Sequence, residues 1–274
     1  MFFTRLLSSV VLVVLALVTI LTGGYLLAAV LLFLSLTAFH ELMKACKLSG
    51  EQGRISGPEL IGGIGIIAYY LVMTLTQERN YLFLIVITIL IALMFLYVFT
   101  FPKYRAEQVM CVFFCVAYAP VMLSFIYLVR VLPYGIYTVW MIFISSWICD
   151  TCAYLSGMLL GKHKLAPVLS PKKSVEGAIG GIVGSALVGA LYGYFLVEAV
   201  ISEQQITWIF VLISAVGAIV SQVGDLAASA IKRNHEIKDY GKLIPGHGGV
   251  MDRFDSVIFT APMIYFLALL LIHG

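Results

Sequence analysis

Charge and cysteine are both scarce in this sequence. Asp, Glu, Lys and Arg make up 11% of the 274 residues, and the net charge is only +3. A charge this small gives no reason to expect nucleic-acid binding. The five cysteines have no spacing that indicates a disulfide framework, and no polar stretch is long enough for a soluble domain. These absences argue against a secreted, disulfide-rich protein and leave a chain dominated by apolar residues.

Apolar residues account for 62% of the chain, and the mean hydropathy is +1.04. A transmembrane helix needs about 20 consecutive apolar residues. We therefore predict an all-α protein, a polytopic transmembrane helix bundle that forms one integral membrane domain. The predicted spans, about nine by this criterion, are 6–22, 25–40, 58–76, 80–100, 107–129, 134–160, 176–198, 206–231 and 254–272.

The basic residues predict the orientation of this bundle. With the N-terminus in the cytoplasm, only Arg79 and Arg130 of the 17 Lys and Arg residues fall in external loops. Cytoplasmic loops of membrane proteins carry an excess of Lys and Arg, so this asymmetry supports the assigned spans. We expect the basic loops 161–175 and 232–253 to face the cytoplasm, where nucleotides are found.

Several features of the apolar runs indicate packing. Cys111 and Cys115 lie in one such run, where cysteine serves as a small hydrophobic residue. Cys149 and Cys152 form a single Cys-x-x-Cys pair, a weak zinc signal without a second pair. A stripe of small residues in the span 176–198 would let a neighbouring helix approach closely; it comprises Gly177, Gly181, Ser185, Gly189 and Gly193.

Two carboxylates, Asp150 and Asp225, lie inside predicted spans. An ionised Asp costs about 2.5 to 3.5 kcal/mol at the centre of a membrane helix, so it usually faces a cavity and serves a function. Polar or small residues recur every four positions beside each acid; they are Ser146 and Tyr154 near Asp150, and Gly217, Ser221 and Ser229 near Asp225. The alternative is a structural hydrogen bond or ion pair between helices.

The most polar part of the chain is SAIKRNHEIKDYGKLIPGHGGVMDRFD, residues 229–255. Its cations and its glycine turn at 245–249 suit phosphate groups, and its carboxylates suit the metal ions that accompany phosphates. An ordinary cytoplasmic loop would explain the cations alone. A second basic loop, 161–177, is rich in phosphate-binding residue types, and Ser174 is placed to cap the following helix; these residues are Lys162, Lys164, Ser170, Lys172, Lys173 and Ser174.

These motifs resemble those of the phosphatidate cytidylyltransferases, also called CDP-diacylglycerol synthases. The resemblance rests on four segments: Asp150-Thr151-x-Ala153-Tyr154, Ser170-Pro171-Lys172-Lys173-Ser174-x-Glu176-Gly177, Gly224-Asp225-Leu226, and the run from Ser229 to Asp255, which matches the family motif without departure. It covers the C-terminal half well, whereas the first hundred residues match only as hydrophobic spans. It implies N-terminal spans in residues 1–130 and catalytic spans in 131–274.

The resemblance also implies a reaction, in which CTP and phosphatidate give CDP-diacylglycerol and pyrophosphate with a divalent cation, normally Mg²⁺. One or two metal ions would be held by Asp225 and Asp252, with Asp255 as a further candidate. Catalytic charge and positioning would come from Lys232, Arg233, His247 and Arg253. Substrate contacts would come from Asp150, Ser170, Lys172, Lys173, Ser174, Lys238, Gly248 and Gly249. Asp150 is left open between a nucleotide contact and a second metal.

His247 is expected to position substrate rather than act as a base, because a phosphate monoester is already largely deprotonated at pH 7, its second pKa being about 6. The expected location is the bacterial cell membrane, with the active site facing the cytoplasm and membrane lipid as a partner; a homodimer is left open. An anion transporter is the main alternative, but the chain shows no internal repeat. A phosphatidyl transferase that consumes CDP-diacylglycerol is another, but the sequence contains no Asp-Gly pair.

Overall fold

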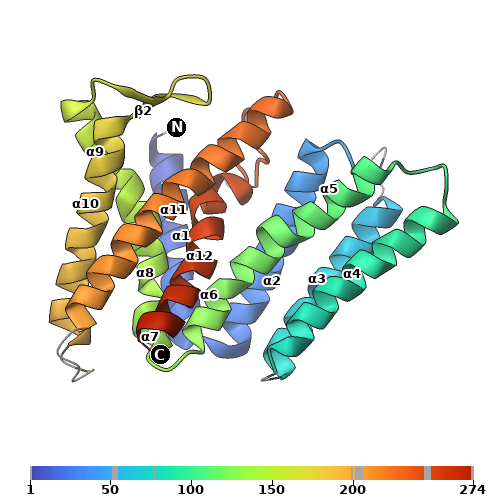
Figure 1. The fold of residues 1–274 in the computed structure, drawn as a ribbon, viewed down its shortest axis with the longest axis horizontal. Coiled ribbons are helices and arrows are strands. Elements are labelled where there is room, and N and C mark those ends of the chain that lie inside the picture. The colour runs from blue at the N-terminus through green and yellow to red at the C-terminus, as the bar shows by residue number, and fades with distance from the viewer. Residues whose placement is uncertain are drawn as a thin grey trace. The chain divides into compact units, whose positions relative to one another are not determined.

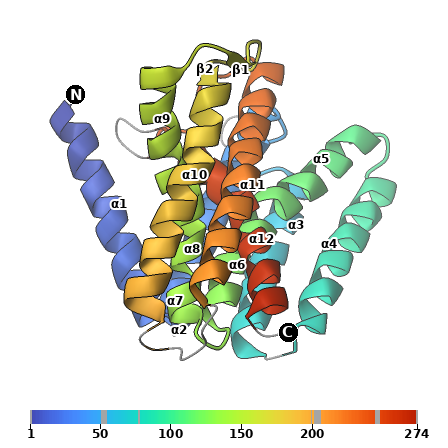
Figure 2. The same ribbon diagram turned by 60° about the vertical axis from the view of Figure 1, so that its left-hand side comes forward.

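The computed structural model describes residues 2–50, 55–76, 78–198, 200, 206–243 and 248–272. The chain forms two compact units. The first comprises Met1–Tyr127 and His235–Arg253, and the second comprises Leu128–Asn234 and Phe254–Gly274. Figures 1 and 2 show that long helices make up most of the ribbon.

The first unit is built from helices whose ends carry recognisable signals. They are α1 (Phe2–Thr22), α2 (Gly24–Ala45), α3 (Gly57–Leu75), α4 (Asn80–Phe99) and α5 (Ala106–Val116), followed by a π-helical turn (Ala117–Val121) and α6 (Met122–Arg130), which continues into the second unit. Ser56 caps α3 by accepting a hydrogen bond from the backbone of Glu59, whose carboxylate accepts one in return from the backbone of Ser56. Pro120 lies in the π-helical turn, since proline lacks the N–H of a regular helix.

The second unit contains helices and one hairpin. Its elements are α7 (Gly135–Thr138), α8 (Trp140–Phe143), a π-helical turn (Ile144–Ile148), α9 (Cys149–Leu160), β1 (Lys164–Ala166), β2 (Ser170–Ser174), α10 (Val175–Tyr192), a third π-helical turn (Gly193–Val197), α11 (Ile206–Asn234) and most of α12 (Met251–Leu271). The hairpin lies at the ends of α9 and α10 (Figure 2).

The helical membrane bundle predicted from the sequence is confirmed. Eight helices among the described residues are long and apolar enough to cross a membrane; they are Gly24–Ala45, Gly57–Leu75, Asn80–Phe99, Ala106–Arg130, Gly135–Leu160, Val175–Val197, Ile206–Asn234 and Met251–Leu271. Each overlaps one predicted span. The remaining predicted span, 6–22, falls on α1, where Val13–Thr22 forms a shorter apolar helix. A total of nine spans and a cytoplasmic N-terminus stay predictions.

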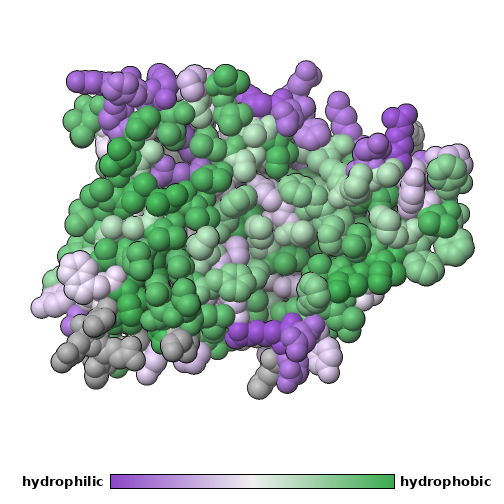
Figure 3. Space-filling view, viewed as in Figure 1, coloured by the Kyte–Doolittle hydropathy of each residue, from purple (hydrophilic) through white to green (hydrophobic). Residues whose placement is uncertain are grey.

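Hydrophobic side chains run along the lengths of the helices, while hydrophilic ones gather above α9 and α10, at the hairpin (Figure 3). The sequence predicts only a basic loop there, but the chain forms an antiparallel pair of strands. Lys164 lies opposite Ser174 and Ala166 opposite Ser170, with an irregularity in the register between the two pairs. The pair directs residues 170–174 into the start of α10.

The small-residue stripe on α10 packs as predicted. Gly181 faces Cys149 and Ala153 of α9 so closely that an added Cβ would approach both within about 3 Å. Near the other end, Gly189 faces Ser214 of α11 and has no room for a side chain. Ser185 is buried and donates a hydrogen bond to the carbonyl of Ile144 at 3.1 Å. The stripe therefore brings α10 close to both helices that carry Asp150 and Asp225.

Candidate active site

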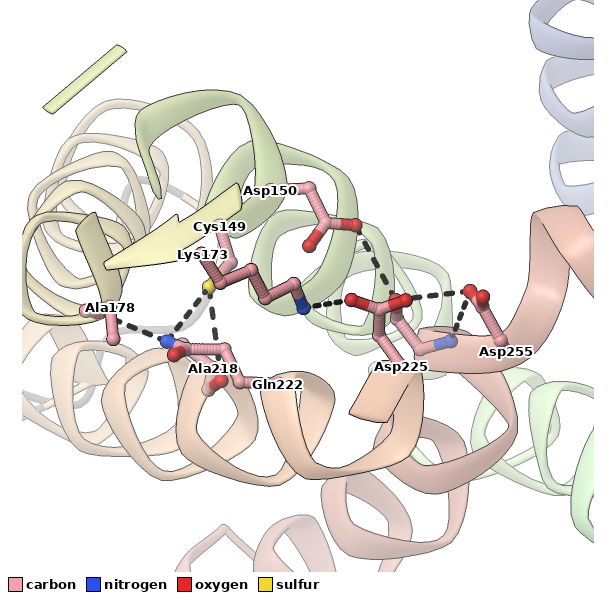
Figure 4. Close-up of polar contacts among 9 residues, drawn as sticks. Cys149, Asp150, Lys173, Ala178, Ala218, Gln222, Asp225 and Asp255 are labelled. Carbon is pink, nitrogen blue, oxygen red and sulfur yellow. Dashed lines mark hydrogen bonds and ion pairs between the residues drawn. The ribbon is translucent and has the colours of Figure 1, made fainter. Parts of the chain in front are cut away.

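Carboxylates from three helices of the second unit surround the side chain of Lys173. Asp150 lies in the first turn of α9, Asp225 in α11, and Asp255 near the start of α12 (Figure 4). The ammonium group of Lys173, on β2, pairs with Asp225 Oδ2. Asp150 and Asp255 are near enough to act on Lys173 electrostatically. The site thus brings together four residues predicted from the sequence.

Ser256 links the carboxylates to one another. Its backbone N–H donates to Asp255 Oδ1 at 2.8 Å. Its hydroxyl lies 3.4 Å from Asp150 Oδ2 and 3.3 Å from Asp255 Oδ1, so it can donate to either carboxylate. The hydroxyl has one proton and serves one of them at a time. Ser256 is 3% exposed, and its sequence context gives no signal of this role.

The electrostatic state of Lys173 follows from its position. Burial lowers the pKa of Lys173 below its ordinary value of 10.5, and the carboxylates of Asp150 and Asp255 partly offset this shift by favouring the ammonium form. The donor set fits a hard divalent cation, because carboxylate oxygens are the ligands such cations prefer. The same carboxylates already attract a cationic group of the protein itself.

A cavity of about 440 Å³ opens beside this cluster, within the usual range for small-molecule sites, roughly 300 to 1,000 Å³. Six predicted site residues line it: Asp150, Ser170, Lys172, Lys173, Ser174 and Asp225. Tyr154, Met158 and Leu165 add an apolar portion. Two predicted catalytic residues that the structure describes, Lys232 and Arg233, do not line this cavity. They occupy the last turn of α11, where basic side chains complement the helix dipole.

Local sequence explains how the cavity wall is built. Ser174 caps α10, as predicted, by accepting a hydrogen bond from the backbone of Gly177 at 3.1 Å. Three glycines crowd its hydroxyl, since an added Cβ at Gly157, Gly161 or Gly177 would meet Ser174 Oγ at about 3 Å or less. Glu176 accepts hydrogen bonds from the backbone of Lys162 and from the ring of His163. These contacts hold the hairpin against the ends of α9 and α10.

A π-helical turn changes the predicted polar face of α9. Four-residue spacing predicts that Ser146, Asp150 and Tyr154 share one face. Instead, Ser146 is buried and donates to the carbonyl of Ile142 at 2.7 Å, whereas Asp150 and Tyr154 are exposed at the cavity. The π-helical turn Ile144–Ile148 inserts an extra residue into the repeat just before Asp150.

The segment His235–Arg253 belongs to the first unit. Asp252 Oδ2 accepts hydrogen bonds from the backbone N–H groups of Tyr240, at 2.8 Å, and Gly249, at 3.0 Å. Gly248 has a φ of 86°, a conformation that favours glycine. Lys238 and Arg253 are exposed. His247, a predicted catalytic residue, lies outside the described residues.

Glu41, on α2, contacts this segment and was not predicted from the sequence. It is 6% exposed and accepts hydrogen bonds from the backbone N–H groups of Val250, at 3.0 Å, and Met251, at 2.9 Å. Its carboxylate fills the space that a side chain at Gly249 would need. The predicted span 25–40 ends just before Glu41, but α2 continues to Ala45. Extending the predicted span to Ala45 would have placed this acid inside a helix.

Comparison with known proteins places the chain in a family. The model of the cytidylyltransferase family matches residues 3–271. A protein of Staphylococcus saprophyticus named phosphatidate cytidylyltransferase is 31% identical over 263 residues, which cover 96% of this chain and 97% of that protein. Proteins of the same name from Staphylococcus epidermidis and Staphylococcus aureus are each 32% identical over 266 residues, covering 96% of this chain and 97% of each relative. The chain belongs to the cytidylyltransferase family.

Family membership confirms the predicted enzyme class, a membrane-embedded nucleotidyltransferase, and decides against the transporter. It also extends the resemblance to the N-terminal half, where sequence motifs gave only hydrophobic spans. The roles of individual site residues stay predictions.

Proposed function

We propose that this enzyme is a phosphatidate cytidylyltransferase that makes CDP-diacylglycerol at the cytoplasmic face of the bacterial membrane. The observation that carries the proposal is the cavity where Lys172 and Lys173 meet Asp150 and Asp225. Its lining combines cations for phosphate groups, carboxylates for a metal ion and apolar side chains beside them. Binding CTP and phosphatidate together requires cations for the phosphate groups, carboxylates for the metal ion and an apolar surface for the lipid.

The bond changes are those of a direct displacement. A phosphate oxygen of phosphatidate attacks the α-phosphorus of CTP, and the bond from that phosphorus to the bridging oxygen of pyrophosphate breaks. Both reactants are anionic, so catalysis depends mostly on charge neutralisation and in-line positioning. Lys172 and Lys173 are suited to hold phosphate oxygens. No protein base is required, because the attacking group is already largely deprotonated near neutral pH.

A divalent cation, when bound, would neutralise charge on the phosphate oxygens that attack and leave. Asp225, Asp255 and Asp150 are the second-unit residues that would hold it, and Ser256 would orient two of these carboxylates. Asp252 stays a predicted ligand from the sequence motif. Its contacts with Tyr240 and Gly249 give it a positioning role in its own segment.

One assay tests the reaction. Purified protein in detergent is supplied with labelled CTP, phosphatidate and Mg²⁺, and the lipid product is separated and identified. We expect CDP-diacylglycerol and an equal amount of pyrophosphate, and no product when phosphatidate is replaced by diacylglycerol. The Asp225→Asn variant serves as the matched blank. Failure of folded, metal-supplied enzyme to form the lipid product would refute the proposal.

A further inference from the structure

Three cysteines and a histidine meet in the first unit. Cys46 follows directly after α2, and Cys111 and Cys115 lie one turn apart on α5. His235 opens the segment 235–253. The Sγ atoms of the three cysteines all lie within 4.8 Å of one another, and Cys46 Sγ lies 3.7 Å from His235 Nε2. The three cysteines thus converge on one point, and His235 contacts one of them, Cys46.

The distance between Cys46 and His235 matches one within a tetrahedral zinc centre, and the three sulfur atoms lie close enough together to approach that geometry. Zinc lies about 2.3 Å from thiolate sulfur and about 2.0 to 2.1 Å from imidazole nitrogen, so neighbouring ligand atoms are roughly 3.6 to 3.8 Å apart. The separation of 3.7 Å between Cys46 and His235 lies within that range. The three sulfur atoms are within 4.8 Å of one another, so separations must shorten by at most about 1 Å to reach it.

We propose that Cys46, Cys111, Cys115 and His235 bind one zinc ion as a structural Cys₃His centre. Thiolate and imidazole ligands favour zinc over Mg²⁺, so this centre is chemically distinct from the carboxylate cluster around Lys173. Each thiol releases its proton to solvent as its sulfur binds the metal, and the imidazole binds through Nε2 in its neutral form. All four ligand positions come from protein, which leaves none for a substrate.

The surroundings favour metal binding over the packing role predicted from sequence. Cys115 is fully buried, and Cys46, Cys111 and His235 are half-buried, so the cluster is sheltered yet reachable from the ends of α2 and α5. On the predicted topology these ends face the cytoplasm, where thiols are kept reduced and disulfides are rare. Sequence analysis missed the centre because only Cys111 and Cys115 are close in sequence.

The centre would fix one end of the segment 235–253. His235 begins this segment, and Glu41 of α2 holds the backbone of Val250 and Met251 at its other end. Zinc at the cysteines would therefore tie the start of the segment to α2 and α5. Between the two ties lie Lys238 and Gly249, both predicted to contact substrate. A structural metal here would position that stretch without entering the reaction.

Metal analysis of the intact protein tests this centre. The wild-type enzyme is purified under reducing conditions, without chelators and without a histidine tag, and its zinc content is measured by mass spectrometry. We expect about one zinc ion per chain. Replacement of zinc by Co²⁺ should give sulfur-to-cobalt charge transfer in the near ultraviolet and the visible bands of a tetrahedral ion. Metal-free wild-type protein that takes up neither ion would overturn the proposal.

Variants assign the ligands. Cys46→Ser and the double variant Cys111→Ser with Cys115→Ser should lose zinc and the cobalt spectrum, whereas Cys152→Ser, outside the cluster, should keep both. Zinc retained by Cys46→Ser, or lost equally from Cys152→Ser, contradicts the assignment. A Cys111–Cys115 or Cys46–Cys111 disulfide, detected after rapid alkylation of cells, contradicts it too. The wild-type measurements decide the question even where a variant fails to fold.

Discussion

The ammonium group of Lys173 contacts a carboxylate oxygen of Asp225 and so joins the basic hairpin to helix α11. Both side chains are partly buried, being 29% and 24% exposed. A charge left behind in such a setting loses its partner without regaining full hydration. The contact therefore makes the two predicted site residues depend on each other, and a change at either one alters the electrostatics of the whole cluster.

We expect Asp225→Asn to lower turnover at least about a hundredfold, because a metal clamp supplies several kcal/mol of transition-state stabilisation. The loss should be strongly non-additive with Lys173→Met, since the two side chains act as a unit. Steady-state rates of the two single variants and the double variant provide the test. A single Asp225→Asn variant with near wild-type activity at ordinary Mg²⁺ would remove Asp225 from the ligand list.

Asp252→Asn tests a predicted ligand in a different setting. The amide oxygen of Asn can still accept the hydrogen bonds from Tyr240 and Gly249, so the segment should stay in place. The negative charge is lost, and we expect turnover to fall as it does for Asp225→Asn. Activity and thermal unfolding are measured together. Normal activity would show that Asp252 serves the backbone of its segment and does not hold the metal.

Lys173 should set an alkaline limit on activity. Its pKa lies below 10.5 because it is buried, so it loses its proton at a lower pH than an exposed lysine. If the ammonium holds phosphate, kcat/KM falls as pH rises through that pKa. Arginine stays protonated over the same range, so Lys173→Arg should move the alkaline limb to higher pH even if its maximal rate is lower. Lys164→Arg, at an exposed position on β1, is the control. If the alkaline limb of the pH profile is the same in Lys173→Arg as in the wild type, another group sets the limit.

Hydropathy predicted the helices of this protein well, because a span depends on the length of an apolar run and little else. Ser174 was placed correctly as a helix cap, since capping depends on neighbouring residues. The hairpin was missed because its strands, which pair Lys164 with Ser174, do not alternate apolar and polar residues. Glu41, Ser256 and the cysteine cluster were missed for a further reason. Their partners are distant in sequence, and only the packing of helices brings them together.

Glu41 should be a stability residue. In Glu41→Gln, one carboxylate oxygen becomes an N–H₂ group that faces the backbone N–H of Val250 or Met251, and a buried donor is left unsatisfied. The expected cost is about 1 to 3 kcal/mol in the free energy of unfolding. Thermal unfolding in detergent measures it, with Glu78→Gln, at an exposed position before α4, as the control. Equal stability of the two variants would mean that the contact contributes little.

The predicted orientation can be tested with single added cysteines and an impermeant thiol reagent in intact cells. Lys164→Cys and Lys242→Cys should resist labelling, because both basic loops are expected in the cytoplasm. Both positions are exposed, whereas Tyr240 of the same loop is buried and unsuitable. Val131→Cys, at an exposed position next to Arg130, should be labelled. Labelling of either basic loop from outside would reverse the topology, and wild-type cells provide the blank.

Direct attack of phosphatidate on CTP predicts inversion of configuration at the α-phosphorus. The cavity lining offers the hydroxyl groups of Ser170, Ser174 and Tyr154. Ser174 is occupied as the cap of α10 and crowded by glycines. An activated nucleophile needs a base within hydrogen-bond reach, which the contacts of Ser174 do not provide. We therefore expect inversion with an α-thio CTP of known chirality, and no exchange of pyrophosphate into CTP when lipid is absent.

Retention of configuration, or robust lipid-free exchange, would require a covalent nucleotidyl-enzyme. In that case loss of the exchange in Ser170→Ala or in Tyr154→Phe, while CTP still binds, would identify the nucleophile.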